Sequence, residues 1–260
     1  MNVWEARVVV RERSLAEIVD LAVRFTLVLG AGVYARLCVF LLLPAYALCF
    51  WLLRREVPVA LVCALALALF SLLQLPFTIA AGRLMFNAEL PLRDVSSSSL
   101  RLLFRSCMAR FTALLLIAGG SSLVVLAPIA IVRSLYLGEV IVLEGAGVGA
   151  AYRRTTRLTS GRVSHTFGVW LSLVATSAVF VAVAQVFARA LSAEGLAIEA
   201  LPEVWGGLSP EAGIAGLFLS LPLVASLRFL AYIDNRTRRE GWDIQVRFLE
   251  LGRVLGAEST

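Results

Sequence analysis

Ionisable side chains interrupt two of the apolar runs. In these runs they are the groups best able to bind charged partners or transfer protons. Glu139 and Glu144 lie in the apolar stretch 135–151, and Arg228 lies in the stretch 213–233. A charge at the centre of a bilayer costs about 2.5–3.5 kcal/mol on insertion scales, so such groups pair, reach the interface or line a polar cavity. Two arrangements of Arg228 therefore stay open: its long side chain extends to the interface, or it pairs with Glu139 or Glu144.

The most charged stretch of the chain, residues 232–248, reads YIDNRTRREGWDIQVRF. On a continuous helix its acids and arginines fall four residues apart, which is the spacing at which opposite charges pair. The pairs are Asp234–Arg238, Arg236–Glu240, Arg239–Asp243 and Asp243–Arg247. Exposed pairs of this kind contribute only about 0.3–0.5 kcal/mol each to stability, so stability alone does not explain why four of them occur together. We expect this stretch to dock on residues 153–162 and on the N-terminal helix through Asp234, Glu240 and Asp243.

A candidate polar network follows from these two observations, joined by arginines of the basic segment 153–162. It comprises Glu139, Glu144, Arg154, Arg157, Arg228, Asp234, Arg236, Arg238, Arg239, Glu240 and Asp243.

The histidine, cysteine, serine and glycine residues do not form the sequence patterns that catalysis, metal binding or cofactor binding needs. His165 is the single histidine and no CxxC pair occurs, whereas metal sites of the His/Cys type need several ligands at set spacings. No Gly-x-Ser-x-Gly elbow accompanies a serine, histidine and acid set. GAGVYA at residues 30–35 imitates a dinucleotide fingerprint but lacks the strand, turn and helix that the fingerprint needs. We therefore expect no enzyme activity, no catalytic residue, no metal site and no cofactor.

The composition places the chain in lipid. Of its 260 residues, 60% are hydrophobic and 16% are charged, with a mean hydropathy of +0.86. A soluble domain is roughly 45–50% apolar and about 25% charged. The excess of apolar residues predicts one membrane domain, residues 1–260, rather than a soluble fold.

Five apolar runs are long enough to cross a bilayer as helices. They cover residues 33–53, 59–81, 111–132, 168–188 and 213–233. Residues 135–151 are too short for a comfortable span and predict a short or broken helix, or a re-entrant hairpin. The predicted fold class is all-α: a polytopic transmembrane helix bundle with five long spans plus one short or broken helix, and amphipathic interfacial helices at both ends.

The ends of the chain predict its orientation. SLAE at residues 14–17 fits a capping box that opens an amphipathic interfacial helix, in which Asp20 and Arg24 are spaced to pair. Residues 1–30 are expected at the cytoplasmic interface, 31–233 in the bundle and 234–260 as a juxtamembrane helix and tail. Arginine gathers in the N-terminal segment, in an expected loop at 82–110, and at 152–162 and 236–253. Basic residues favour the cytoplasmic side, so both termini are expected there.

One segment carries a resemblance. VIVLEGAGVGAAYRRTTRLTSGR, residues 140–162, resembles a Leu-Glu-Gly, small-residue, Arg-(Ser/Thr) segment of bacterial polytopic membrane proteins. That group includes the membrane domain joined to some glycerophosphoryl diester phosphodiesterases. RSLAEIVDLAVRF at residues 13–25 and YIDNRTRREGWD at residues 232–243 are similar to the beginning and the end of related members. The resemblance implies a multi-helix inner-membrane protein. It does not imply phosphodiesterase activity, which belongs to a separate soluble domain.

Two functions of different classes fit these patterns. The first is a non-enzymatic scaffold or regulatory component of an assembly in the bacterial cytoplasmic membrane, whose basic face attracts anionic lipid head groups and protein partners of the membrane or cytoplasm. The alternative is a transporter or channel subunit with a site at the broken helix 135–151, because interrupted helices frame substrate sites in transporters. The basic charge fits the membrane orientation, so no nucleic acid is expected as a partner.

Overall fold

The structure is a computed structural model that describes residues 13–85, 91–121, 127–193 and 209–240. These described residues form helices and connections without a strand, which confirms the all-α class. In chain order the first elements are α1 (Leu15–Arg24), the π-helical turn η2 (Phe25–Leu29), α2 (Ala31–Leu37), the π-helical turn η3 (Cys38–Leu42), α3 (Leu43–Arg54) and α4 (Val59–Leu84). They are followed by α5 (Leu92–Ser121), α6 (Ala127–Ser134), α7 (Leu137–Glu144), α8 (Val148–Thr159), α9 (Val163–Ala193) and α10 (Pro210–Glu240).

In the part of the chain that the structure describes, four helical segments are long and apolar enough to cross a membrane. They are Ala31–Arg54, Val59–Leu84, Val163–Leu191 and Pro210–Arg239. The third of them shows why the chain needs lipid: its apolar window has a mean hydropathy of 2.1, yet only 11% of that window is buried. Apolar side chains such as Val183 and Phe187 face outward, where water would be unfavourable and lipid is not. By length and composition the chain is a multi-pass membrane protein.

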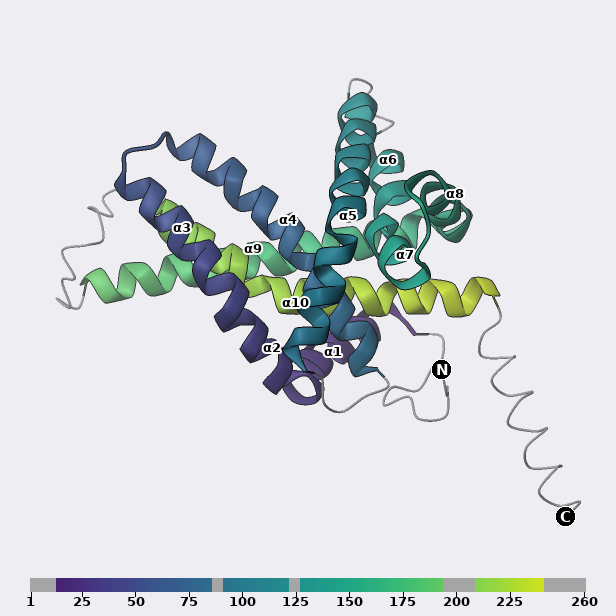
Figure 1. Ribbon diagram of the computed structural model, residues 1–260, viewed down its shortest axis with the longest axis horizontal. Helices are drawn as coiled ribbons and strands as arrows, with labels where there is room; N and C mark the ends of the chain where they lie inside the picture. The colour runs from purple at the N-terminus through teal and green to yellow at the C-terminus, as the bar shows by residue number, and fades with distance from the viewer. Residues whose placement is uncertain (1–12, 86–90, 122–126, 194–208, 241–260) are drawn as a thin grey trace, which may run out of the picture.

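The predicted count of five long spans is not confirmed. The stretch 111–132 was expected as one span, but α5 ends at Ser121 and α6 begins at Ala127. α6 packs against α5, as Figure 1 shows, so the described parts of this stretch lie beside each other. The basic segment 82–110 also differs from the expected loop, because much of it forms the first half of α5.

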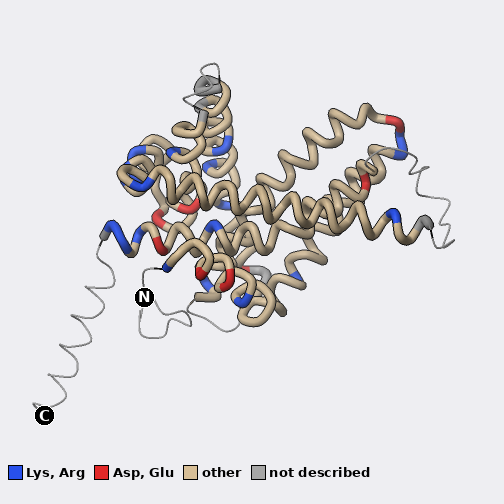
Figure 2. The backbone as a smooth tube through the Cα atoms, turned by 180° about the vertical axis from the view of Figure 1, so that it is seen from behind, with Lys and Arg blue, Asp and Glu red and all other residues tan. Residues whose placement is uncertain are grey.

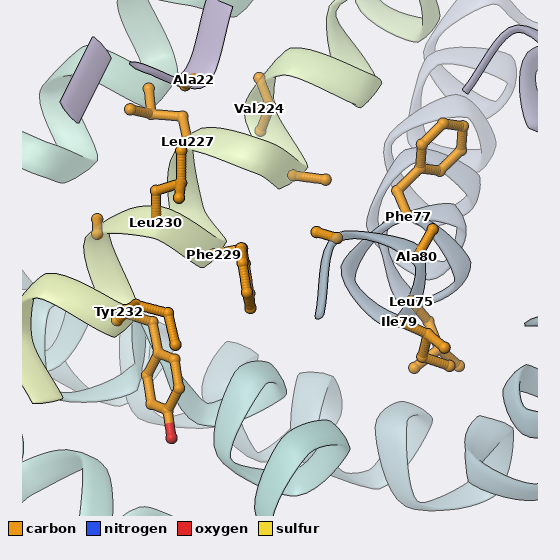
Figure 3. Packing of buried hydrophobic residues seen from close by; sticks show 14 of the residues in the cluster. Ala22, Leu75, Phe77, Ile79, Ala80, Val224, Leu227, Phe229, Leu230 and Tyr232 are labelled. Atoms are coloured by element: carbon orange, nitrogen blue, oxygen red, sulfur yellow. The ribbon is translucent and has the colours of Figure 1, made fainter. Parts of the chain in front are cut away.

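The helix α10 lies at the centre of the bundle. In its spanning segment 72% of the apolar window is buried, and it packs against both α9 and α4. Figure 3 shows the contact with α4, where Phe229 of α10 points toward the helix that carries Phe77 and Ala80. On the other side, a Cβ placed on Gly216 would lie 2.6 Å from the carbonyl oxygen of Phe180 on α9. The absence of a side chain at this glycine therefore allows α9 and α10 to touch backbone to backbone.

Charged residues gather toward one end of the bundle. Figure 2 shows long uncharged stretches along the spanning helices, and clusters of blue and red around α8, α1 and the end of α10. α1 begins with the predicted capping box, in which the Ser14 amide donates to the Glu17 carboxylate at 2.8 Å and the Ser14 hydroxyl accepts from the Glu17 amide at 3.3 Å. Its buried face carries Ile18 and Ala22, and α1 packs with that face in the core against α10.

A left-handed glycine breaks the element expected at residues 135–151. α7 ends at Glu144, and Gly145 follows with φ of 67°, a conformation that side-chain-bearing residues adopt at a cost. α8 then starts at Val148. The break turns the chain so that residues of α8 return toward Glu144.

Gly145→Ala should lower the free energy of unfolding by about 1–2 kcal/mol, because the left-handed conformation is unfavourable for alanine. No atom lies within 4 Å of the added Cβ, so the effect is conformational rather than steric. The matched control is Gly149→Ala inside α8, which also meets nothing within 4 Å and should raise stability by about 0.5–1 kcal/mol. Melting curves of the two purified variants in the same detergent check the prediction, and equal shifts in one direction would contradict it.

Candidate functional site

Arg228 of α10 forms the deepest ion pair among the described residues. Its Nε donates to Oε1 of Glu139 on α7, and its Nη1 donates to Oε1 of Gln74 on α4 at 2.7 Å. The Glu139 side chain is 0% exposed and that of Arg228 is 15% exposed. Of the arrangements that the sequence left open, the structure has the pair with Glu139. One guanidinium thus joins three helices at a depth where an unpaired charge would be costly.

Glu144 binds a different set of partners. The Arg154 Nε lies 3.2 Å from its Oε2, and the Arg236 Nη1 lies 3.8 Å from its Oε1. The Tyr232 hydroxyl also donates to Oε1 at 2.7 Å. The carboxylate at the end of α7 therefore holds the folded-back α8 against α10.

Asp234 is, with Glu139, a fully buried carboxylate of the predicted network, at 1% exposure of its side chain. It accepts from the backbone amide of Arg13 at 2.8 Å and from the Arg238 Nε at 3.0 Å, and the Arg162 Nη1 lies 3.8 Å away. Arg238 in turn donates to the Arg13 carbonyl at 2.6 Å. Through Asp234 the end of α10 contacts both the N-terminal segment at Arg13 and the segment 153–162 at Arg162, which is the Asp234 part of the docking expected from the sequence.

The remaining members of the predicted network are placed less centrally. Arg239 donates to the Ser160 hydroxyl at 2.9 Å, and Arg157 is exposed on α8. Glu240 is the last residue of α10, with a side chain outside the described part, and Asp243 lies outside the described residues altogether. The segment 234–240 is also not a separate interfacial helix, because α10 runs through it without a break.

Sequence reasoning missed Asn235, which is fully buried beside Asp234. Its side-chain oxygen accepts from the Arg162 Nη1 at 3.1 Å, and its amide reaches the Thr166 hydroxyl at 3.5 Å. Asn235 is uncharged and stands between Asp234 and Arg236, so the search for charged residues did not include it. The available signal was its position on the face of α10 that carries the apolar core.

A cavity of about 700 Å³ lies beside the Arg228 guanidinium and opens to the outside of the bundle, where its lining residues Leu67, Leu114 and Val174 are exposed. Its walls are mostly apolar and come from α4, α5, α6, α7, α9 and α10. In the spans the lining residues fall at 67–74 of Val59–Leu84, 170–181 of Val163–Leu191 and 217–228 of Pro210–Arg239, which places the cavity at the middle depth of the bundle. The polar side chains that line it are Ser71, Gln74, Arg110, Ser134, Ser177 and Arg228.

Arg110 of α5 is the second cation of the cavity. Its Nη1 donates to the Ser71 hydroxyl at 2.5 Å, and its Nε donates to the Ser106 hydroxyl at 3.2 Å. Among the described residues no carboxylate lies within ion-pair distance of it. The cavity therefore presents two guanidiniums of which one is paired, a donor set suited to binding an anion rather than to covalent chemistry.

Comparison of the chain with known proteins finds no match to a family model, to a curated protein or to a solved structure. Within the described ranges, no group of three or more His, Cys, Asp and Glu side chains is placed to hold a metal ion.

Proposed function

We propose that the chain is a multi-pass protein of the bacterial cytoplasmic membrane that binds a ligand in this cavity and acts as a transporter subunit. The observation that carries the proposal is the cavity itself, at the middle depth of three spans and beside the interrupted element 135–151. Leu135, Leu137 and Gly138 of that element line it. Substrate sites of transporters lie near the bilayer midplane and are framed by discontinuous helices.

The orientation that we propose, with both termini in the cytoplasm, rests on three features. The four candidate spans among the described residues would return the chain to the side on which it started. The backbone amide of Arg13, near the N-terminus, donates to Asp234 near the end of α10. Arginine is frequent at this end of the bundle, at residues such as Arg154 and Arg162, and basic residues favour the cytoplasmic side.

Filling the cavity should stop transport. Ala113→Phe adds a ring to a partly buried lining position of α5, and we expect at least a tenfold slower flux in proteoliposomes of the intact chain. Suitable probes are labelled inorganic phosphate, acetate and the fluorescent forms of phosphatidylglycerol and phosphatidylcholine. The matched control, Ala175→Phe, adds the same ring to an exposed position of α9 outside the cavity and should leave the flux unchanged. Equal flux for both variants, or none above that of empty vesicles, would contradict a transporter role.

A second candidate function is the non-enzymatic scaffold or regulator. It is supported by the ion-paired end of the bundle, which holds α1, α8 and α10 together and leaves Arg153 and Arg157 exposed on α8. Such a face would attract anionic head groups, at about 1 kcal/mol per arginine near the surface. Purification in mild detergent tests it: a stoichiometric protein partner that Arg153→Gln/Arg157→Gln releases would favour the scaffold over the transporter.

A further inference from the structure

The cavity has a polar end and an apolar end. α4 and α10 run in the same direction, because Ala66 packs in one cluster with Phe218 while Gln74, further along α4, accepts from Arg228, further along α10. In the proposed orientation, Ser71, Gln74 and Arg228 therefore line the part of the cavity nearer the cytoplasm, together with Arg110 of α5, which donates to Ser71, and Leu67 and Leu217 line the opposite part. Along α10, Leu217 and Arg228 are eleven residues apart, which is about 16 Å on a helix.

The polar end carries an excess of positive charge. Arg110 and Arg228 line it, and Glu139, which binds Arg228, is the carboxylate close to both. Two cations and one anion leave a formal charge of +1 at this end. Gln74 and Ser71 accept hydrogen bonds from the two guanidiniums and so fix them on one face of α4. An anionic group placed between them would complete the charge balance, and guanidiniums bind phosphate and carboxylate through paired N–H donors.

We propose that the cavity binds an anionic amphiphile, with its phosphate or carboxylate head group at Arg110 and Arg228 and its hydrocarbon chain against the apolar walls. The inference names the ligand class of the site in the proposed function and rests on that cavity being a binding site. A volume of about 700 Å³ falls in the usual range of ligand pockets, about 300–1,000 Å³. The lining suits both halves of such a molecule: Leu114, Ile117, Val181 and Leu217 face the chain, and burying it is favourable.

Native mass spectrometry of the intact detergent-solubilised chain tests the ligand class with four probes. Phosphatidylglycerol and oleate carry an anionic head group and a chain, phosphatidylcholine has a chain but no net charge, and inorganic phosphate has charge but no chain. We expect one phosphatidylglycerol or one oleate to be retained, at least tenfold more tightly than either of the other two probes. Equal retention of phosphatidylcholine would overturn the charge requirement, and equal retention of inorganic phosphate would overturn the requirement for a chain.

Substitution of Arg110 tests the head-group position. Arg110→Gln should weaken retention of phosphatidylglycerol at least tenfold, and Arg110→Lys, which keeps the charge and loses the planar fork, should weaken it less. The matched control is Arg101→Gln, an exposed position of the same helix outside the cavity, which should change nothing. If all three variants bind equally, or if Arg101→Gln weakens binding as much as Arg110→Gln, the proposed head-group site is wrong. Binding of the anionic probes without flux would contradict the transporter role and leave the proposed ligand class standing. Flux or binding of phosphatidylcholine but of neither anionic lipid would overturn the anionic ligand class and leave the transporter role standing.

Discussion

Glu139→Leu should lower the free energy of unfolding by about 3–5 kcal/mol, because removing one partner of a buried ion pair leaves the other charge uncompensated. The Arg228 side chain is only 15% exposed, and after the substitution its remaining hydrogen-bond partner among the described residues is the neutral Gln74. We expect a lower melting temperature in mild detergent and a lower yield of monodisperse protein. Glu139→Gln, which keeps the shape and removes the charge, separates electrostatics from packing and should lose most of the same stability.

The double variant Glu139→Leu/Arg228→Met should recover most of what the single variant loses. Replacing both members of a buried pair by apolar residues of similar volume is often neutral or stabilising. A double-mutant cycle on thermal stability in detergent gives the coupling between the two positions. Additive losses, with the double variant less stable than either single one, would show that Arg228 and Glu139 do not stabilise the bundle as a pair.

Interactions between neighbours on one helix were predictable from the sequence. The capping box of Ser14, the pair Asp20–Arg24 and the pair Asp234–Arg238 all occur in the structure. Each joins residues three or four positions apart, and the helix geometry alone brings such residues together. Where the chain was correctly assigned as helix, these contacts followed without knowledge of the packing.

The span count was less predictable, because hydropathy averages over residues that end helices. The run 111–132 is apolar enough for a span, but it contains Gly119 and Gly120 in its middle and Pro128 near its end. α5 ends just after the two glycines, and α6 begins with proline at its second position, which is a common place for proline at a helix start. Giving the glycines and the proline more weight than the mean hydropathy would have predicted two helices here.

The partners of the cavity could not be derived from one sequence. Arg101, Arg105 and Arg110 cannot be told apart by residue type or sequence pattern, yet of these three only Arg110 lines the cavity. The difference depends on which face of α5 meets α4, and that is decided by packing between helices. Ser71 and Gln74, three residues apart in an apolar run, were a usable signal for a polar face on α4, but they do not indicate which side chain they bind.

Asp234→Ala should lower the free energy of unfolding by on the order of 3 kcal/mol and should open the charged end of the bundle around Asp234. The carboxylate is almost fully buried, and three groups are left without it: the Arg13 amide, the Arg238 guanidinium and the Arg162 guanidinium. The first of these holds the N-terminal segment on α10. We therefore expect trypsin to cleave at Arg13 and Arg162 much faster in the variant than in the parent protein.

Two further substitutions separate the causes of this effect. Asp234→Asn keeps an oxygen for the Arg13 amide and removes the charge, so it should protect Arg13 better than Asp234→Ala while leaving Arg162 equally sensitive. Asp20→Ala is the matched control, because Asp20 pairs with Arg24 at side-chain exposures of 62% and 72%, and such exposed pairs contribute about 0.2–1 kcal/mol. It should give the cleavage pattern of the parent. If Asp234→Ala gives that pattern too, the buried carboxylate does not hold the N-terminal segment, and the charged end of α10 serves only to anchor the helix at the membrane surface.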